Sequence, residues 1–68
     1  MIGTIIRLLP NKGYGFIRGE DKLARFFHAK DLPNPHFFDT LREGLTVNFT
    51  PIETERGLRA SCVVLESK

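Results

Sequence analysis

The chain alternates short apolar runs with short clusters of turn-forming residues. Five runs have this form: Ile2–Leu9, Tyr14–Arg18, Ala24–His28, Leu45–Ile52 and Leu58–Leu65. In the fourth run, Leu45, Val47 and Phe49 alternate with polar residues, which is the period of a strand with one buried face. Five short strands without a long helix predict an all-β fold. We expect a small barrel that is closed or nearly closed, because closure removes exposed strand edges.

The segment Ala29–Glu43 interrupts this pattern. Its apolar residues have the spacing of a helix, but Pro33 and Pro35 exclude a helix through its middle. We expect one helical turn near Lys30–Leu32, followed by a loop. Pro51, near the end of the fourth predicted strand, indicates an edge position or a strand terminus.

The size and charge of the chain limit its function. Sixty-eight residues make one domain, 1–68, with room for one core and no deep substrate cavity. The net charge is +2, but residues 1–30 carry six basic and two acidic residues, whereas residues 31–68 carry four basic and six acidic ones. The positive half also contains two strands rich in aromatic residues. Basic residues interleaved with aromatic rings favour a polyanion with stackable bases.

Cysteine and histidine are too few to build a disulfide or a metal site. Cys62 is the single cysteine, and its apolar strand predicts a small buried filler. His28 and His36 lack further ligands nearby, so neither a metal nor a cofactor is expected. We find no signal peptide and no apolar run of about 18 residues, which predicts a cytoplasmic protein without membrane association.

The segment KGYGFI, residues 12–17, carries a cation, two aromatic rings and two glycines. On a strand, Tyr14 and Phe16 share one face, and the glycines leave that surface uncrowded. With Lys12 beside them, the two rings could form a stacking surface for unpaired bases. The alternative is that both rings belong to the core of a small β-protein.

A second aromatic strand favours the binding surface. In the segment RFFH, residues 25–28, Phe26 and His28 face one way, and Arg25 and Phe27 face the other. If this strand pairs with the preceding one, four rings lie on one face. The expected core already contains Ile5, Ile17, Phe27, Leu45, Val47, Phe49, Cys62, Val63 and Leu65. So small a barrel cannot bury four more rings, and exposed aromatic clusters usually mark a binding surface.

In this order and at this spacing, the motifs resemble the cold-shock domain over nearly the whole chain. The matching pieces are Gly3-Thr4-Ile5, Lys12–Ile17, Phe26-Phe27-His28, Thr40–Gly44 with Val47 and Phe49, and Arg56-Gly57 with Ala60 and Val63. The resemblance implies a five-stranded antiparallel OB-type barrel. It also implies a protein that binds single-stranded RNA or DNA and acts as an RNA chaperone. We expect this protein to be a cytoplasmic monomer.

The resemblance also implies which residues bind. Lys12, Tyr14, Phe16, Phe26 and His28 fall on the family's aromatic surface. Phe38, with Phe37 beside it, falls where the family has a loop aromatic that stacks a further base. Arg56 and Arg59 fall near the rim, and Arg7 falls in the first strand, where it would stack on a base or meet a phosphate.

The chain departs from the family pattern at several positions. Arg7 and Leu8 stand where a tryptophan and a phenylalanine are usual, and Ala29 stands where another phenylalanine is common. Arg25 stands at a position that usually holds a core valine. Each lost stack is worth about 1–3 kcal/mol, so we expect weaker binding than is typical of the family.

Two other functions can be weighed against nucleic-acid binding. The thinned aromatic surface is compatible with a protein-interaction barrel that has kept the fold and lost its affinity for nucleic acid. An RRM fold is disfavoured, because its motif continues to a second aromatic where this chain has Gly19, and because Pro33 and Pro35 leave no room for two helices. An enzyme is not expected, since no paired carboxylates, activated nucleophile or phosphate-cradling loop is recognisable.

Overall fold

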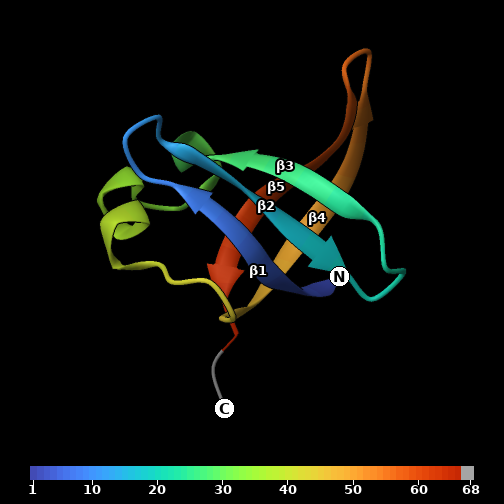
Figure 1. The fold of residues 1–68 in the computed structure, drawn as a ribbon. Helices are drawn as coiled ribbons and strands as arrows, with labels where there is room; N and C mark the ends of the chain where they lie inside the picture. The colour runs from blue at the N-terminus through green and yellow to red at the C-terminus, as the bar shows by residue number, and fades with distance from the viewer. Residues whose placement is uncertain (67–68) are drawn as a thin grey trace.

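A computed structural model describes residues 1–66 of the chain. The strands are β1 (Ile2–Leu9), β2 (Tyr14–Gly19), β3 (Ala24–His28), β4 (Thr46–Thr54) and β5 (Gly57–Leu65). Two short 3-10 helices, η1 (Ala29–Asp31) and η2 (Pro35–Thr40), lie between β3 and β4. The strands close into a barrel in the order β1-β2-β3-β5-β4, which confirms the predicted fold class (Figure 1).

One contact of the barrel differs from the antiparallel arrangement expected of it. Strand β1 pairs antiparallel with β2 and with β4, as do β2 with β3 and β4 with β5. Strands β3 and β5 instead meet in parallel, with Phe26 opposite Arg59. Beyond its first residues, β4 pairs only with β5, so Pro51 lies on an edge, where its missing N–H costs no ladder hydrogen bond.

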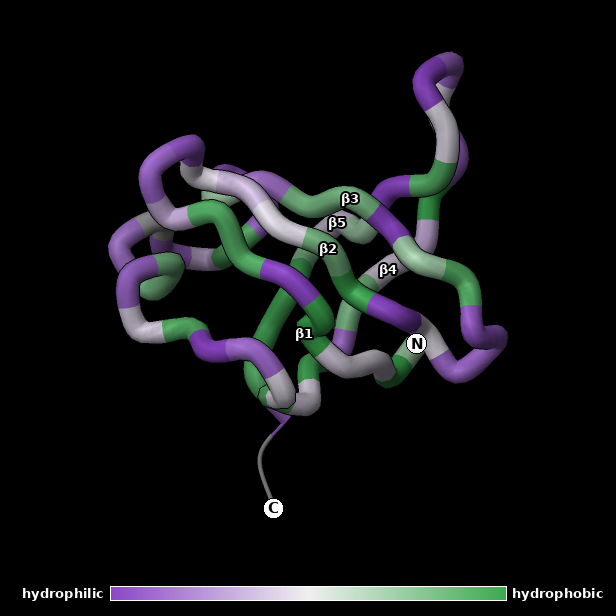
Figure 2. Tube along the Cα trace, in the orientation of Figure 1, coloured by the Kyte–Doolittle hydropathy of each residue, from purple (hydrophilic) through white to green (hydrophobic). Residues whose placement is uncertain are grey.

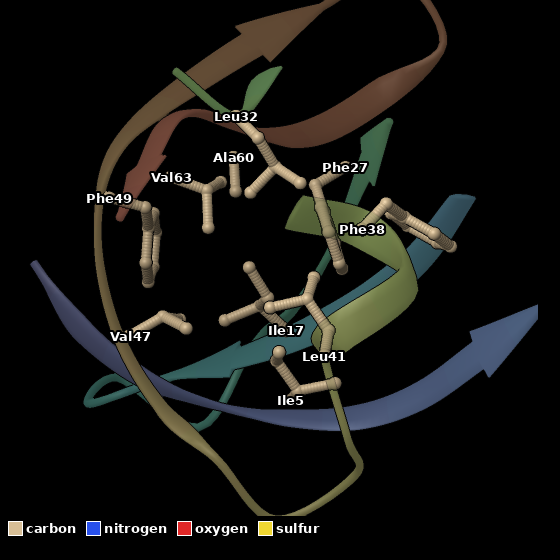
Figure 3. Packing of buried hydrophobic residues seen from close by; sticks show 10 residues of the cluster. All are labelled: Ile5, Ile17, Phe27, Leu32, Phe38, Leu41, Val47, Phe49, Ala60 and Val63. Atoms are coloured by element: carbon tan, nitrogen blue, oxygen red, sulfur yellow. The ribbon is translucent and has the colours of Figure 1, made fainter. Parts of the chain in front are cut away.

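The core is formed by the inward residues of all five strands and by apolar side chains from the η1–η2 segment (Figure 3). Its buried apolar members are Ile5, Ile17, Phe27, Leu32, Phe38, Leu41, Val47, Phe49, Ala60 and Val63. Leu45 is partly buried against this cluster. Hydrophilic residues concentrate in the turns and at the tip of the β4–β5 hairpin, which projects from the barrel (Figure 2).

The prediction that Cys62 is buried is wrong. Cys62 is exposed, and its backbone φ of 51° lies in the left-handed region. The pairing of β4 with β5 shifts here, so that Ser61 and Cys62 both lie outside the core before Val63 turns inward. A β-bulge of this kind changes which residues face inward, which simple alternation does not anticipate. Leu65, also expected in the core, is 51% exposed at the end of β5.

The segment between β3 and β4 forms more helix than was expected. In addition to η1, the six-residue η2 begins at Pro35, where a proline lacks only an N–H that needs no partner. The Asn34 side chain caps it by accepting a hydrogen bond from the His36 amide at 3.0 Å. The prolines therefore separate two short helices, η1 and η2, and they do not prevent the second helix from forming.

Arg25 occupies an inward position of β3 and is 5% exposed. Its two terminal nitrogens donate to the two carboxylate oxygens of Asp21, and its guanidinium lies over the Phe49 ring at 5.5 Å. The hydrogen bond from Arg25, followed by one from the Leu23 amide, lowers the pKa of the Asp21 carboxyl to about 2. A Cβ on Gly19 would lie 2.6 Å from a guanidinium nitrogen, so this glycine makes room for the buried cation.

Candidate nucleic-acid interface

Three aromatic rings form one cluster on the outer face of β2 and β3. The Tyr14 and Phe16 ring centroids lie 6.1 Å apart, and Phe26 lies 5.2 Å from Tyr14 and 6.2 Å from Phe16. The register places Phe16 opposite Phe26 and Tyr14 opposite His28. We call these four residues the aromatic platform. All four are only partly buried, so their rings present apolar surface to the outside of the barrel.

Glycine at position 15 allows β1 and β2 to approach closely beneath this platform. A Cβ there would lie 2.5 Å from the Arg7 carbonyl oxygen and 3.0 Å from the Phe27 ring. The inward position between the two platform residues of β2 must therefore carry no side chain. Gly13, in the turn that leads into β2, has a φ of 73°, a conformation that favours glycine. The alternation of aromatics and glycines thus follows from the close packing of the strands.

Arg7 borders the platform because of a β-bulge. The register of β1 with β2 shifts between Ile5 and Arg7, so Ile6 and Arg7 are both exposed. Beyond the shift, Arg7 lies opposite Phe16. The predicted cation is therefore next to the predicted stacking ring. Lys12 is exposed in the turn between β1 and β2, at the Tyr14 end of the same surface.

His28 is held by the start of η1. Its Nδ1 accepts a hydrogen bond from the Lys30 amide at 3.1 Å, and its own amide donates to Asp31 Oδ2 at 2.8 Å. Together these bonds form a capping box, which fixes the ring at the end of β3. In the neutral imidazole, an accepting Nδ1 leaves the proton on Nε2.

Arg59 covers part of the platform from β5. Its guanidinium carbon lies 5.3 Å from the Phe26 centroid, and Nη2 donates to Asp31 Oδ2 at 3.0 Å. The same carboxylate oxygen thus accepts from the His28 amide and from Arg59. Asp31 was not predicted as a site residue, although the spacing His28-x-x-Asp31 has the form of a capping box and is visible in the sequence.

A groove of about 480 Å³ extends the platform toward the β4–β5 hairpin, and we call it the hairpin groove. Its walls include Phe26, His28, Lys30, Thr54, Arg56 and Arg59. The predicted rim residues Arg56 and Arg59 therefore lie on the groove and beside the platform. Lys30 and Thr54 were missed, because the separation of β3 from the hairpin in the sequence gave no sign of their proximity.

The structure corrects the assignment of Phe38. This ring is 5% exposed and packs in the core, 5.9 Å from the Phe27 ring, so it offers no face to a base. Its neighbour Phe37 is 51% exposed. Because η2 is helical, adjacent residues point in different directions, and only one of the two can face the core. Phe37 is therefore the exposed aromatic ring of this loop.

The family of the chain follows from its similarity to known proteins. The model of the 'Cold-shock' DNA-binding domain matches residues 1–66. The chain belongs to the cold-shock domain family. Cold-shock domains are a nucleic-acid-binding, non-enzymatic family, and this chain carries a cluster of aromatic rings on the outside of its barrel.

Individual cold shock proteins match over most of their length. The chain is 40% identical to Cold shock protein 1 of Lactiplantibacillus plantarum over 62 residues, covering 91% of this chain and 92% of the relative. It is 40% identical to a cold shock-like protein of Aquifex aeolicus, over 90% and 87% of the two chains. It is 36% identical to Cold shock protein CspA of Staphylococcus saprophyticus, over 91% and 92%. In residues 1–66 of this cold-shock domain, no helix has the length and apolar character needed to span a membrane.

Proposed function

We propose that this cold-shock domain binds single-stranded RNA or DNA, with bases stacked on the aromatic platform. The observation that carries the proposal is the cluster of Tyr14, Phe16 and Phe26, whose centroids lie 5.2–6.2 Å apart on the outside of the barrel. Exposed rings on one face suit unpaired bases, because each base offers a π-face that a duplex keeps stacked internally.

We propose a role for each group around the platform. Tyr14, Phe16, Phe26 and His28 stack bases, and Phe37 stacks a further one. Arg7 and Lys12 contact phosphates along one edge, and Arg56 and Arg59 contact the nucleic acid along the other, where they line the hairpin groove. Phe38 is omitted from this set because it is buried. Such a protein would act as an RNA chaperone by trapping single strands, which requires no energy source.

Further parts of the proposal concern the state of the protein. We propose that residues 1–68 act as one monomeric domain, since every strand pairs with a neighbour on each side over at least part of its length and Pro51 lies on the remaining edge of β4. We propose a cytoplasmic location, where an exposed free thiol such as Cys62 remains reduced. Neither a metal nor a cofactor is part of the mechanism.

A titration of fluorescent oligonucleotides tests the proposal. We expect six-residue oligo-dT or oligo-U to bind, a matched duplex to bind more weakly, and Phe16→Ala to lower the affinity by about 1–3 kcal/mol. Leu23→Ala, which removes an exposed apolar side chain from the β2–β3 turn, serves as the matched control. The fold of each variant is checked by circular dichroism.

Two results would count against this proposal. One is equal affinity for duplex and single strand, and the other is unchanged affinity in a folded Phe16→Ala variant. If oligonucleotides bound only at millimolar concentration, while a protein partner was retained in an affinity pull-down, the chain would instead be a protein-interaction barrel. In that case the family fold would have been kept without its nucleic-acid affinity.

A further inference from the structure

The charged side chains that line the hairpin groove are hydrogen-bond donors. Lys30, Arg56 and Arg59 contribute cationic N–H groups to its walls. The Thr54 hydroxyl is already engaged, because it donates to the Gly57 carbonyl at 3.0 Å and accepts from the Arg56 amide at 3.2 Å. The side chains of the groove therefore favour a ligand edge that carries acceptors.

His28 adds another donor to the same wall. Its Nδ1 is occupied by the Lys30 amide, so the neutral ring presents Nε2–H rather than a lone pair. The hydrogen bond from the Lys30 amide fixes this ring orientation, and Asp31 completes the capping box by accepting from the His28 backbone amide. A base that presents an amino group to this wall would place donor against donor, which disfavours the amino edges of adenine and cytosine.

Arg59 has the fixed orientation that reading a base requires. Its guanidinium lies over the Phe26 ring at 5.3 Å, and Asp31 engages Nη2 at 3.0 Å. This ion pair engages Nη2 alone, the Arg59 guanidinium makes no other hydrogen bond within residues 1–66, and Arg59 lines the groove. A guanidinium held in this way can donate two parallel hydrogen bonds, unlike a lysine.

From these contacts we propose that the hairpin groove is a guanine-selective subsite, in which Arg59 donates to O6 and N7 of the base. Guanine presents these two acceptors side by side, and no other base does so. The groove volume of about 480 Å³ admits one nucleotide. The proposal rests on the proposed function, because it assigns base preference to the same binding surface. It also gives Asp31 a role, as the residue that positions Arg59.

Substituted oligonucleotides test this subsite on the unmodified protein. The probe is a labelled thymidine hexamer in which one central base is replaced by guanine, adenine, cytosine, hypoxanthine or 7-deazaguanine. We expect the guanine oligomer to bind about fivefold or more tighter than the all-thymine one. Hypoxanthine keeps O6 and N7 and should retain the gain, whereas 7-deazaguanine lacks N7 and should lose most of it.

A charge-preserving variant then assigns the preference to Arg59. Arg59→Lys keeps the positive charge but loses the fork, so the guanine and thymine oligomers should bind with the same affinity. Arg56→Lys is the matched control on the groove, and it should keep the ratio between the two oligomers even if both bind more weakly. If Arg59 contacts only phosphate, the guanine and thymine oligomers should bind with equal affinity to the wild type and to both variants.

The outcomes separate this inference from the proposed function. If the all-thymine hexamer binds but guanine and 7-deazaguanine give affinities within twofold of it, the subsite is overturned and the platform stands. The subsite is also overturned if Arg59→Lys keeps the full guanine preference. If no oligomer binds below millimolar concentration, the proposed function itself fails.

Discussion

Asp21 binds both terminal nitrogens of Arg25, at 2.9 and 2.5 Å, and thereby neutralises a cation that lies at an inward position of the barrel. The two partners differ in exposure: the Arg25 side chain is 5% exposed, whereas that of Asp21 is 33% exposed. The Arg25 Nε atom is buried and has no hydrogen-bond partner within the described residues. The pair is therefore asymmetric, because the buried cation has only one further hydrogen bond, from Nη1 to the Leu23 carbonyl at 3.3 Å, whereas water reaches the carboxylate.

This asymmetry predicts unequal effects of removing each partner. Asp21→Asn leaves a buried guanidinium without its counterion and should lower the free energy of unfolding. Arg25→Val leaves only a carboxylate that water can reach, so it should lower the free energy of unfolding less than Asp21→Asn does. Urea unfolding of both variants measures the difference. A larger loss for Arg25→Val than for Asp21→Asn would contradict this account.

The lowered pKa of Asp21 predicts an acid-sensitive contribution to stability. The carboxyl has a pKa of about 2 in the folded protein, against an ordinary value of 3.8. Its contribution is complete above the ordinary value and is lost as the pH falls toward the folded value. The stability difference between wild type and Asp21→Asn should thus be constant at neutral pH and shrink between about pH 4 and 2. In an Arg25→Val background the same comparison should change much less with pH.

Phe37 and Phe38 should separate binding from folding. Phe37 is 51% exposed, so Phe37→Ala should lower oligonucleotide affinity by about 1–3 kcal/mol with little change in stability. Phe38 is 5% exposed, so Phe38→Ala should lower the free energy of unfolding by about 3–5 kcal/mol. Parallel urea and anisotropy titrations measure both quantities. The assignment would be reversed if Phe38→Ala stayed fully stable and bound weakly.

Restoring an aromatic ring beside Phe16 should strengthen binding. Arg7→Trp adds a stacking surface opposite Phe16 and should raise the affinity by about 1–3 kcal/mol. It also removes a phosphate contact, so the slope of log affinity against log salt should become shallower by about 0.7. Thr46→Trp, at an exposed position of β4, is the control for added aromatic area. An unchanged salt slope would show that Arg7 does not contact phosphate.

Strand periodicity predicted most of the fold and the centre of the site. Alternation placed Tyr14, Phe16, Phe26 and His28 on one face, because side chains on paired strands alternate between the two sides. The register of β2 with β3 confirms this arrangement. These inferences depend on local spacing and on the pairing of neighbouring strands, which the sequence expresses directly.

The parts that could not be predicted depend on bulges and on contacts between distant segments. The bulge before Arg7 and the one at Cys62 each change which residues face outward, and neither carries a glycine or proline that would reveal it. The contact of Arg59 with Asp31 joins residues 28 positions apart. Predicting this contact requires knowing that β5 lies beside β3 in the barrel.

The parallel pairing of Phe26 with Arg59 is where β3 meets β5 and the barrel closes. The same two residues line the hairpin groove. A nucleotide bound in this groove would contact both β3 and β5 and would oppose the separation of these two strands. Bound oligonucleotide should therefore slow amide hydrogen exchange in β3 and β5 beyond the residues it touches, because transient opening of the joint would first require the ligand to leave.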